Sequence, residues 1–143
     1  MKLQTPQIQE KMTALLGQFN NQKETLIMID RELAALHTQQ AKNNATIAAV
    51  KSEYEQEAAA IKAKFEQSHA LALDDYTLIQ KAKAELKARL DFFTATGEEL
   101  EEKIYQKSEQ VFTAKAQLLA TRKHLIFSYG EALADEFIQQ HIE

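Results

Sequence analysis

Apolar residues recur along the first half of the chain in alternating steps of four and three positions. This average spacing of about 3.5 residues places side chains along one edge of a supercoiled α-helix. We call these positions the seam: Ile8, Met12, Leu15, Phe19, Gln22, Leu26, Ile29, Leu33, Leu36, Gln40, Asn43, Ile47, Val50, Tyr54, Glu57 and Ile61. All but four are apolar, whereas 45% of the whole chain is apolar. The pattern predicts long helices that pack against one another.

Two consecutive seam positions, Gln40 and Asn43, are polar, and Asn44 follows directly. In one interpretation the chain turns at residues 42–45 and Asn44 caps the next helix, since Asn side chains compete with the backbone for hydrogen bonds. In the other, a single helix continues and the polar residues form core layers that fix the register. We favour the turn, so the first helix is expected over residues 6–41, after a start at Thr5 and Pro6.

A second helix is expected over residues 46–93. Its apolar track shifts phase at Phe65 and His69, where two four-residue steps follow each other in the manner of a stutter. The shifted track continues through Ala72, Tyr76, Ile79, Lys83, Leu86, Leu90 and Phe93. Asp74 and Asp75 are a possible second break, but we expect the helix to continue because the track crosses them.

The clearest predicted break lies at residues 94–96. Thr96 and Glu99 have the spacing of a capping box, in which each side chain bonds the other residue's backbone N–H. A third helix follows over residues 97–127, with Leu100, Ile104, Val111, Leu118 and Leu125 on one stripe. Ser128 and Glu131 repeat the capping pattern, which predicts a short helix over residues 129–142.

These elements predict an all-α fold, an elongated antiparallel bundle or coiled coil of three long helices and a short C-terminal one. One proline and three glycines among 143 residues leave few turns, and we expect a single domain over residues 1–143. We also expect core packing to account for most of the aromatic side chains on or beside the apolar stripes, which are Phe19, Tyr54, Phe65, Tyr76, Phe92, Phe93, Phe112 and Phe127.

Composition narrows the functional classes. The formal net charge is −4 and the isoelectric point is about 5.6, whereas nucleic-acid-binding domains are usually basic. There is no cysteine, no apolar signal segment within residues 1–9, and no apolar run near the ~20 residues that span a bilayer. We therefore expect a cytoplasmic protein without a membrane or nucleic-acid partner.

No catalytic motif stands out. Glu66 and His69 form one E-x-x-H pair, but di-metal bundles use two such pairs with further carboxylates. The three glycines are too far apart for a phosphate-binding loop. We therefore expect no enzymatic activity, no bound metal and no cofactor.

Two groups form the candidate interaction surface. The first is basic: Lys81, Lys83, Lys87 and Arg89. Lys81, Glu85 and Arg89 also have the spacing of a charge ladder on one helix face, which is typical of a solvated surface. The second group is apolar and C-terminal: Leu133, Phe137 and Ile138.

The function predicted is that of a non-enzymatic structural or interaction protein: an oligomeric scaffold, adaptor or chaperone-like clamp. An accessory protein of a phage or mobile element is one hypothesis, since such proteins are often small and helical. The alternative is a regulator that binds another macromolecule, such as nucleic acid, through the basic group. A homodimer is expected, because a helix over residues 46–93 would extend beyond its shorter neighbours and expose apolar positions that need cover.

Overall fold

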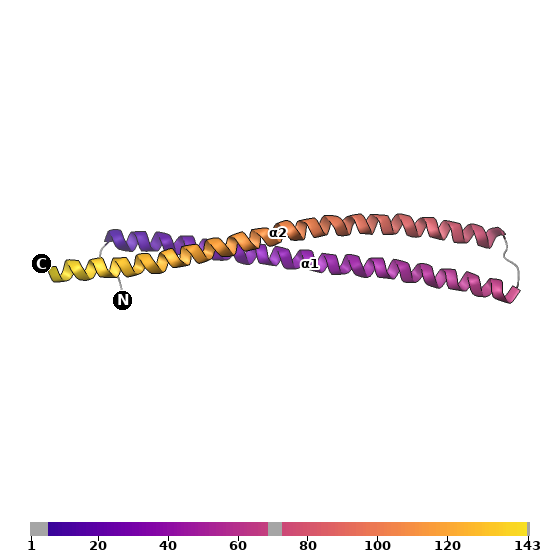
Figure 1. Ribbon diagram of the computed structural model, residues 1–143, viewed down its shortest axis with the longest axis horizontal. Helices are drawn as coiled ribbons and strands as arrows, with labels where there is room; N and C mark the ends of the chain where they lie inside the picture. Colours follow the sequence, from indigo (N-terminus) through magenta and orange to yellow (C-terminus); the bar gives the residue numbers. More distant parts are fainter. Residues whose placement is uncertain (1–5, 69–72, 143) are drawn as a thin grey trace. The chain divides into compact units, whose positions relative to one another are not determined.

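A computed structural model describes residues 6–68 and 73–142, and all of them are α-helical (Figure 1). Helix α1 runs over Pro6–Ser68 (63 residues) and helix α2 over Leu73–Ile142 (70 residues). The predicted all-α class is confirmed. The predicted number of helices is not, because two long helices replace the three long and one short. Neither described helix contains a stretch apolar enough, over sufficient length, to cross a membrane.

The chain divides into two compact units, and each combines a segment of both helices. Unit 1 contains the described residues up to Leu33 and those from Gln106 onward, and unit 2 contains Ala34–Tyr105. Packing between α1 and α2 within each unit therefore supplies its core.

The two segments of unit 2 run antiparallel. Lys64 Nζ lies 3.6 Å from Asp75 Oδ1, and Arg89 Nη1 lies 3.4 Å from Glu53 Oε2. Further from the start of α2, the Asn43 side-chain amide donates a hydrogen bond to the Phe93 carbonyl. Lower-numbered residues of α1 thus pair with higher-numbered residues of α2.

Unit 1 has the same antiparallel arrangement. The Lys107 ammonium donates to Glu32 Oε2 at 2.6 Å, while Met12 and Tyr129 line a common hollow. An antiparallel pair buries one edge of each helix, so every third or fourth residue becomes covered.

The seam predicts the covered edge of α1 closely. Every seam position except Glu57 is buried or half-buried, and Ala58 is covered in place of Glu57. On α2 the covered edge follows the same spacing, through Ile79, Ala82, Leu86, Leu90, Phe93, Gly97, Leu100, Ile104, Lys107, Val111, Ala114, Leu118, Thr121, Leu125, Ser128 and Ala132. The stripe expected from Leu100 to Leu125 is included in it.

The predicted turn at residues 42–45 is wrong, because α1 is continuous there. Asn43 is only 8% exposed, and its amide bonds the Phe93 carbonyl at 2.9 Å. Packing against α2 supplies the side chain with a partner that a turn would otherwise provide. The alternative of an uninterrupted helix with a polar core residue is the one observed at Asn43.

The predicted break at residues 94–96 is also wrong, since α2 is continuous from Leu73 to Ile142. Thr96 is not an N-cap: its hydroxyl donates to the Phe92 carbonyl at 3.0 Å, one turn back in the same helix. A cap stabilises a helix end by about 1 kcal/mol. The covered positions Phe93, Gly97 and Leu100 continue in phase through this region, and burial outweighs the local signal.

The predicted helix end at residue 128 does not occur either. Ser128 is buried on the covered edge, and α2 continues past Gly130. The predicted helix over residues 46–93 is divided instead, because α1 ends at Ser68 and α2 begins at Leu73. Asp74 and Asp75 occupy the first turn of α2, where negative charge favours the positive end of the helix dipole.

The shifted track predicted beyond Ile61 is correct only in part. Ile79, Leu86, Leu90 and Phe93 are half-buried, whereas Phe65, Tyr76 and Lys83 are exposed. The covered edge of α2 uses Asp75 and Ala82 instead. The remaining positions of the track, His69 and Ala72, lie outside the described residues.

Candidate interaction surface

Helix α2 carries a line of exposed apolar side chains in unit 1. Phe112, Leu119 and Ile126 are 76%, 54% and 62% exposed. They follow one another at seven-residue intervals, which is close to two helical turns, so they share a face. We call these three residues the heptad line. Each lies one position after a covered residue of α2, which is about 100° further around the helix, so the line lies outside the packed edge.

Helix α1 extends this apolar region. Leu16 lines a hollow of about 420 Å³ together with Ile126, so the two side chains are on the same side of unit 1. Ile27 is about three helical turns from Leu16 and shares its face. Both Leu16 and Ile27 are exposed. We call Leu16, Ile27 and the heptad line together the apolar face.

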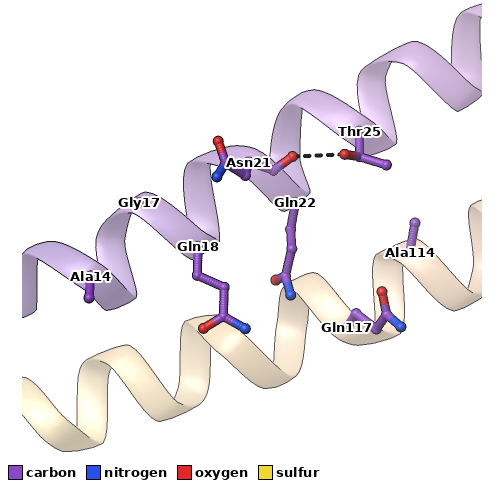
Figure 2. Close-up of a pocket in the computed structure, with 8 residues that line it drawn as sticks. All are labelled: Ala14, Gly17, Gln18, Asn21, Gln22, Thr25, Ala114 and Gln117. Carbon is purple, nitrogen blue, oxygen red and sulfur yellow. Dashed lines mark hydrogen bonds between the residues drawn. The ribbon is translucent and has the colours of Figure 1, made fainter. Parts of the chain in front are cut away.

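A second hollow in unit 1 is rich in side-chain amides. Figure 2 shows Gln18 and Gln22 of α1 extending toward α2, where Gln117 lies. Gly17 has no side chain and that of Ala114 is small, so the hollow has an open volume of about 520 Å³. Gln117 precedes Leu119 by two residues, about 200° around the helix, so this polar hollow and the heptad line lie on different sides of α2.

One amide oxygen in this hollow is notable. Gln22 Oε1 is buried and has no hydrogen-bond partner among the described residues. Such a group costs about 1–3 kcal/mol when it is left unsatisfied, and most buried polar atoms in native proteins have a partner. The side chains around it, including Asn21 and Thr25, are neutral. The hollow therefore offers neutral hydrogen-bonding groups without a charged anchor.

The predicted basic group lies in unit 2 and is exposed. Arg89 pairs across to Glu53 of α1 at 3.4 Å, whereas the expected ladder placed it with Glu85 on α2. Glu85 and Glu57 line the same small hollow as this pair. Carboxylates around the Arg89 guanidinium make that end of the basic group less suited to a phosphate ligand.

The predicted C-terminal group is partly exposed. Phe137 and Ile138 are exposed and Leu133 is half-buried, while the Phe137 ring lies 4.2 Å from that of His141. Leu133 follows Ile126 by seven residues and therefore continues the direction of the heptad line. The C-terminal group belongs to unit 1, whereas the basic group belongs to unit 2.

The heptad line was not predicted as a surface. The expectation that most of the eight aromatic side chains pack in the core is wrong. Three of them are half-buried, Phe19, Tyr54 and Phe93, whereas the other five are exposed: Phe65, Tyr76, Phe92, Phe112 and Phe127. The available signal was the width of the apolar stripe: Leu118 is followed by Leu119, and Leu125 by Ile126 and Phe127. A single packed edge covers only the first residue of each run.

Within the described part of the chain, no three His, Cys, Asp or Glu residues come together in a group that could hold a metal ion. Glu66 is exposed, and His69 lies outside the described residues. Known protein families, curated proteins and solved structures contain no match to this chain.

Proposed function

We propose that this protein is a non-enzymatic structural or interaction protein that associates as a homodimer through the apolar face. The observation that supports this proposal is the exposure of Phe112, Leu119 and Ile126 along one face of α2. Soluble monomers rarely expose large contiguous apolar patches, and such patches commonly mark protein–protein contacts.

The apolar face suits a partner helix. Burying one Leu, Ile or Phe side chain is worth about 1.5–3 kcal/mol, and the face offers five such side chains to each partner. Their spacing of seven residues on α2 is the repeat by which helices pack along a shared edge. We therefore propose that unit 1 packs against unit 1 of a second copy as a four-helix, coiled-coil-like bundle.

A second copy is the partner that needs no further assumption. Most soluble oligomers are homo-oligomers, and two-fold symmetric dimers are the commonest. Two copies would present the same apolar surface to each other, so both faces would be covered in one step. A scaffold or adaptor role follows, in which unit 1 holds the dimer together and other surfaces remain available to partners.

Light scattering of the purified chain over an approximately hundredfold range of concentration tests the proposal. A mass of two chains that falls toward one chain on dilution is expected. A mass of one chain at every concentration would exclude self-association. Phe112→Ser is the variant that tests the surface, and Phe92→Ser is its matched control, since Phe92 is an exposed aromatic side chain of α2 in unit 2. Only Phe112→Ser is expected to weaken the dimer.

A further inference from the structure

We infer that one contact between α1 and α2 of unit 2 fixes the register in which these two helix segments pair. It consists of the Asn43 side-chain amide, the Phe93 carbonyl that accepts its hydrogen bond, and Gly97, which leaves room for the amide. We call these three groups the register contact. All of them belong to unit 2 of a single chain, so the inference does not depend on the proposed homodimer.

Apolar periodicity alone leaves this register open. Covered positions on both segments of unit 2 recur at seven-residue intervals. Sliding one helix past the other by seven residues, or about 10 Å, therefore places one covered edge against the other again. In coiled coils a single buried polar residue such as asparagine commonly specifies the register. Asn43, which is 8% exposed, occupies such a position on α1.

Gly97 makes the Phe93 carbonyl accessible to Asn43. The Cα–Cβ bonds of a helix tilt toward its N-terminus, so a side chain at residue 97 would cover the turn that contains the Phe93 carbonyl. A Cβ atom there would lie 3.1 Å from Asn43 Nδ2. The carbonyl oxygen has two lone pairs and can accept the amide in addition to its own helical bond. Gly97 is the one glycine on a covered edge of the described residues, because Gly17 and Gly130 are exposed.

A shift by seven residues would remove both the acceptor and the space. The residues that would take the places of Phe93 and Gly97 are large and apolar in either direction: Leu86 and Leu90, or Leu100 and Ile104. Their side chains would cover the backbone of α2 and fill the space that the Asn43 amide occupies. The amide would then be buried without a partner, which is unfavourable.

Other polar groups of unit 2 distinguish the registers less. The ion pairs Lys64–Asp75 and Glu53–Arg89 also join the two helices, but the Lys64, Glu53 and Arg89 side chains are each more than half exposed. Exposed ion pairs contribute little to stability. Gln40 is a half-buried seam residue, and its side chain has no hydrogen-bond partner among the described residues. The register contact is therefore the buried polar contact that separates one register from the next.

The distance between two spin labels reports the register. The chain has no cysteine of its own, so labels can be attached at Glu55→Cys on α1 and Lys103→Cys on α2, two exposed positions of unit 2. Dilution with excess unlabelled chain restricts double electron–electron resonance to distances within one chain. A single distance is expected when the register contact is intact. Two distances about 10 Å apart would show that the contact does not fix the register, and would overturn the inference.

Removal of the register contact is the first test. Asn43→Leu combined with Gly97→Leu makes this layer similar to its apolar neighbours. An additional distance about 10 Å from the original one is expected, with helix content retained in circular dichroism. Gln40→Leu is the matched control, since it also replaces a polar seam residue with leucine but leaves the register contact in place. A single unchanged distance in the double variant, or an added distance in the control, would overturn the inference.

Relocation of the opening is the second test. Gly97→Ile combined with Ile104→Gly exchanges the two residues and moves the opening seven residues along α2, where the Leu100 carbonyl would accept the Asn43 amide. Residue 55 pairs with a part of α2 that precedes residue 103, since its neighbour Glu53 pairs with Arg89. The shift therefore brings residues 55 and 103 closer, and the distance is expected to shorten by about 10 Å.

An unchanged distance in the exchange variant would show that other contacts hold the register, and it would overturn the inference. If the exchange lowers the helix content, the double leucine variant decides, because it keeps an apolar seam. Loss of helical structure in both variants would also overturn the inference, since it requires that the shifted registers can pack. None of these outcomes depends on whether the chain is a dimer, which light scattering measures separately.

Discussion

Replacing Gly97 with alanine is expected to leave the free energy of unfolding almost unchanged, although alanine is the better helix former. Alanine in a helix interior is favoured over glycine by about 0.8–1 kcal/mol. A Cβ atom at residue 97 would lie 3.1 Å from Asn43 Nδ2, so the amide has to move. That amide is held by its hydrogen bond to the Phe93 carbonyl, which is worth about 1 kcal/mol. The gain and the loss nearly cancel.

The cancellation is removed when Asn43 is absent. In an Asn43→Ala background the added methyl group meets no amide, and Gly97→Ala is expected to stabilise the protein by about 1 kcal/mol. The coupling between the two substitutions is then about 1 kcal/mol, which is within the range found for residues in contact. Gly17→Ala is the matched control, because a Cβ atom there meets nothing within 4 Å. It is expected to stabilise the wild-type chain by about 1 kcal/mol.

Urea denaturation followed by circular dichroism measures all four members of the cycle and the control. Protein concentration has to be the same for every variant, since self-association would add to the apparent stability. Equal slopes with denaturant would show that the free energies are comparable. The reasoning is refuted if Gly97→Ala stabilises the protein equally with and without Asn43. Failure of Gly17→Ala to stabilise the protein would remove the helix-propensity reference itself.

Two further predictions concern single positions. Thr96→Ala is expected to change the free energy of unfolding by less than about 0.5 kcal/mol, because the Thr96 hydroxyl bonds the Phe92 carbonyl within a continuous helix and does not cap a helix end. If urea denaturation shows a loss of about 1 kcal/mol, a helix end at Thr96 is indicated instead. Phe137→Asp is expected to lower the average mass measured by light scattering more than Lys87→Glu does, since it places a charge close to the direction of the heptad line. A larger drop for Lys87→Glu would point to the basic group as the contact.

The periodicity of the sequence was sufficient to predict the fold class and the covered edge of α1. Positions from Ile8 to Ile61 alternate by four and three, and the structure covers all of them except Glu57. Such a pattern is reliable because one packed edge of a helix demands it at every turn. The same reasoning identified the stripe from Leu100 to Leu125. It also noted the width of that stripe without resolving which residues stay exposed.

The place where the chain reverses was decided by packing between α1 and α2. The capping patterns at Thr96 and Ser128, and the asparagines at residues 43 and 44, are local signals worth about 1 kcal/mol each. Two of these side chains are hydrogen-bonded without ending a helix. The Thr96 hydroxyl bonds a carbonyl one turn back in its own helix, and the Asn43 amide bonds a carbonyl of the facing helix. The covered edges stay in phase through residues 43 and 97, so a turn there would expose apolar residues on both sides. Beyond Ile61 the phase is lost, and α2 begins at Leu73.

The exposed heptad line is likewise a property of tertiary structure. Sequence alone shows adjacent apolar residues at 111–112, 118–119 and 125–127, and each run offers more than one candidate for the core. A two-helix contact covers only a narrow edge of each helix. Val111, Leu118 and Leu125 are therefore covered by the contact, whereas the residues that follow them, Phe112, Leu119 and Ile126, remain exposed to solvent. Only the number of helices packed in unit 1 distinguishes a core residue from a surface residue at these positions, because each helix pair can cover only the edges that face each other.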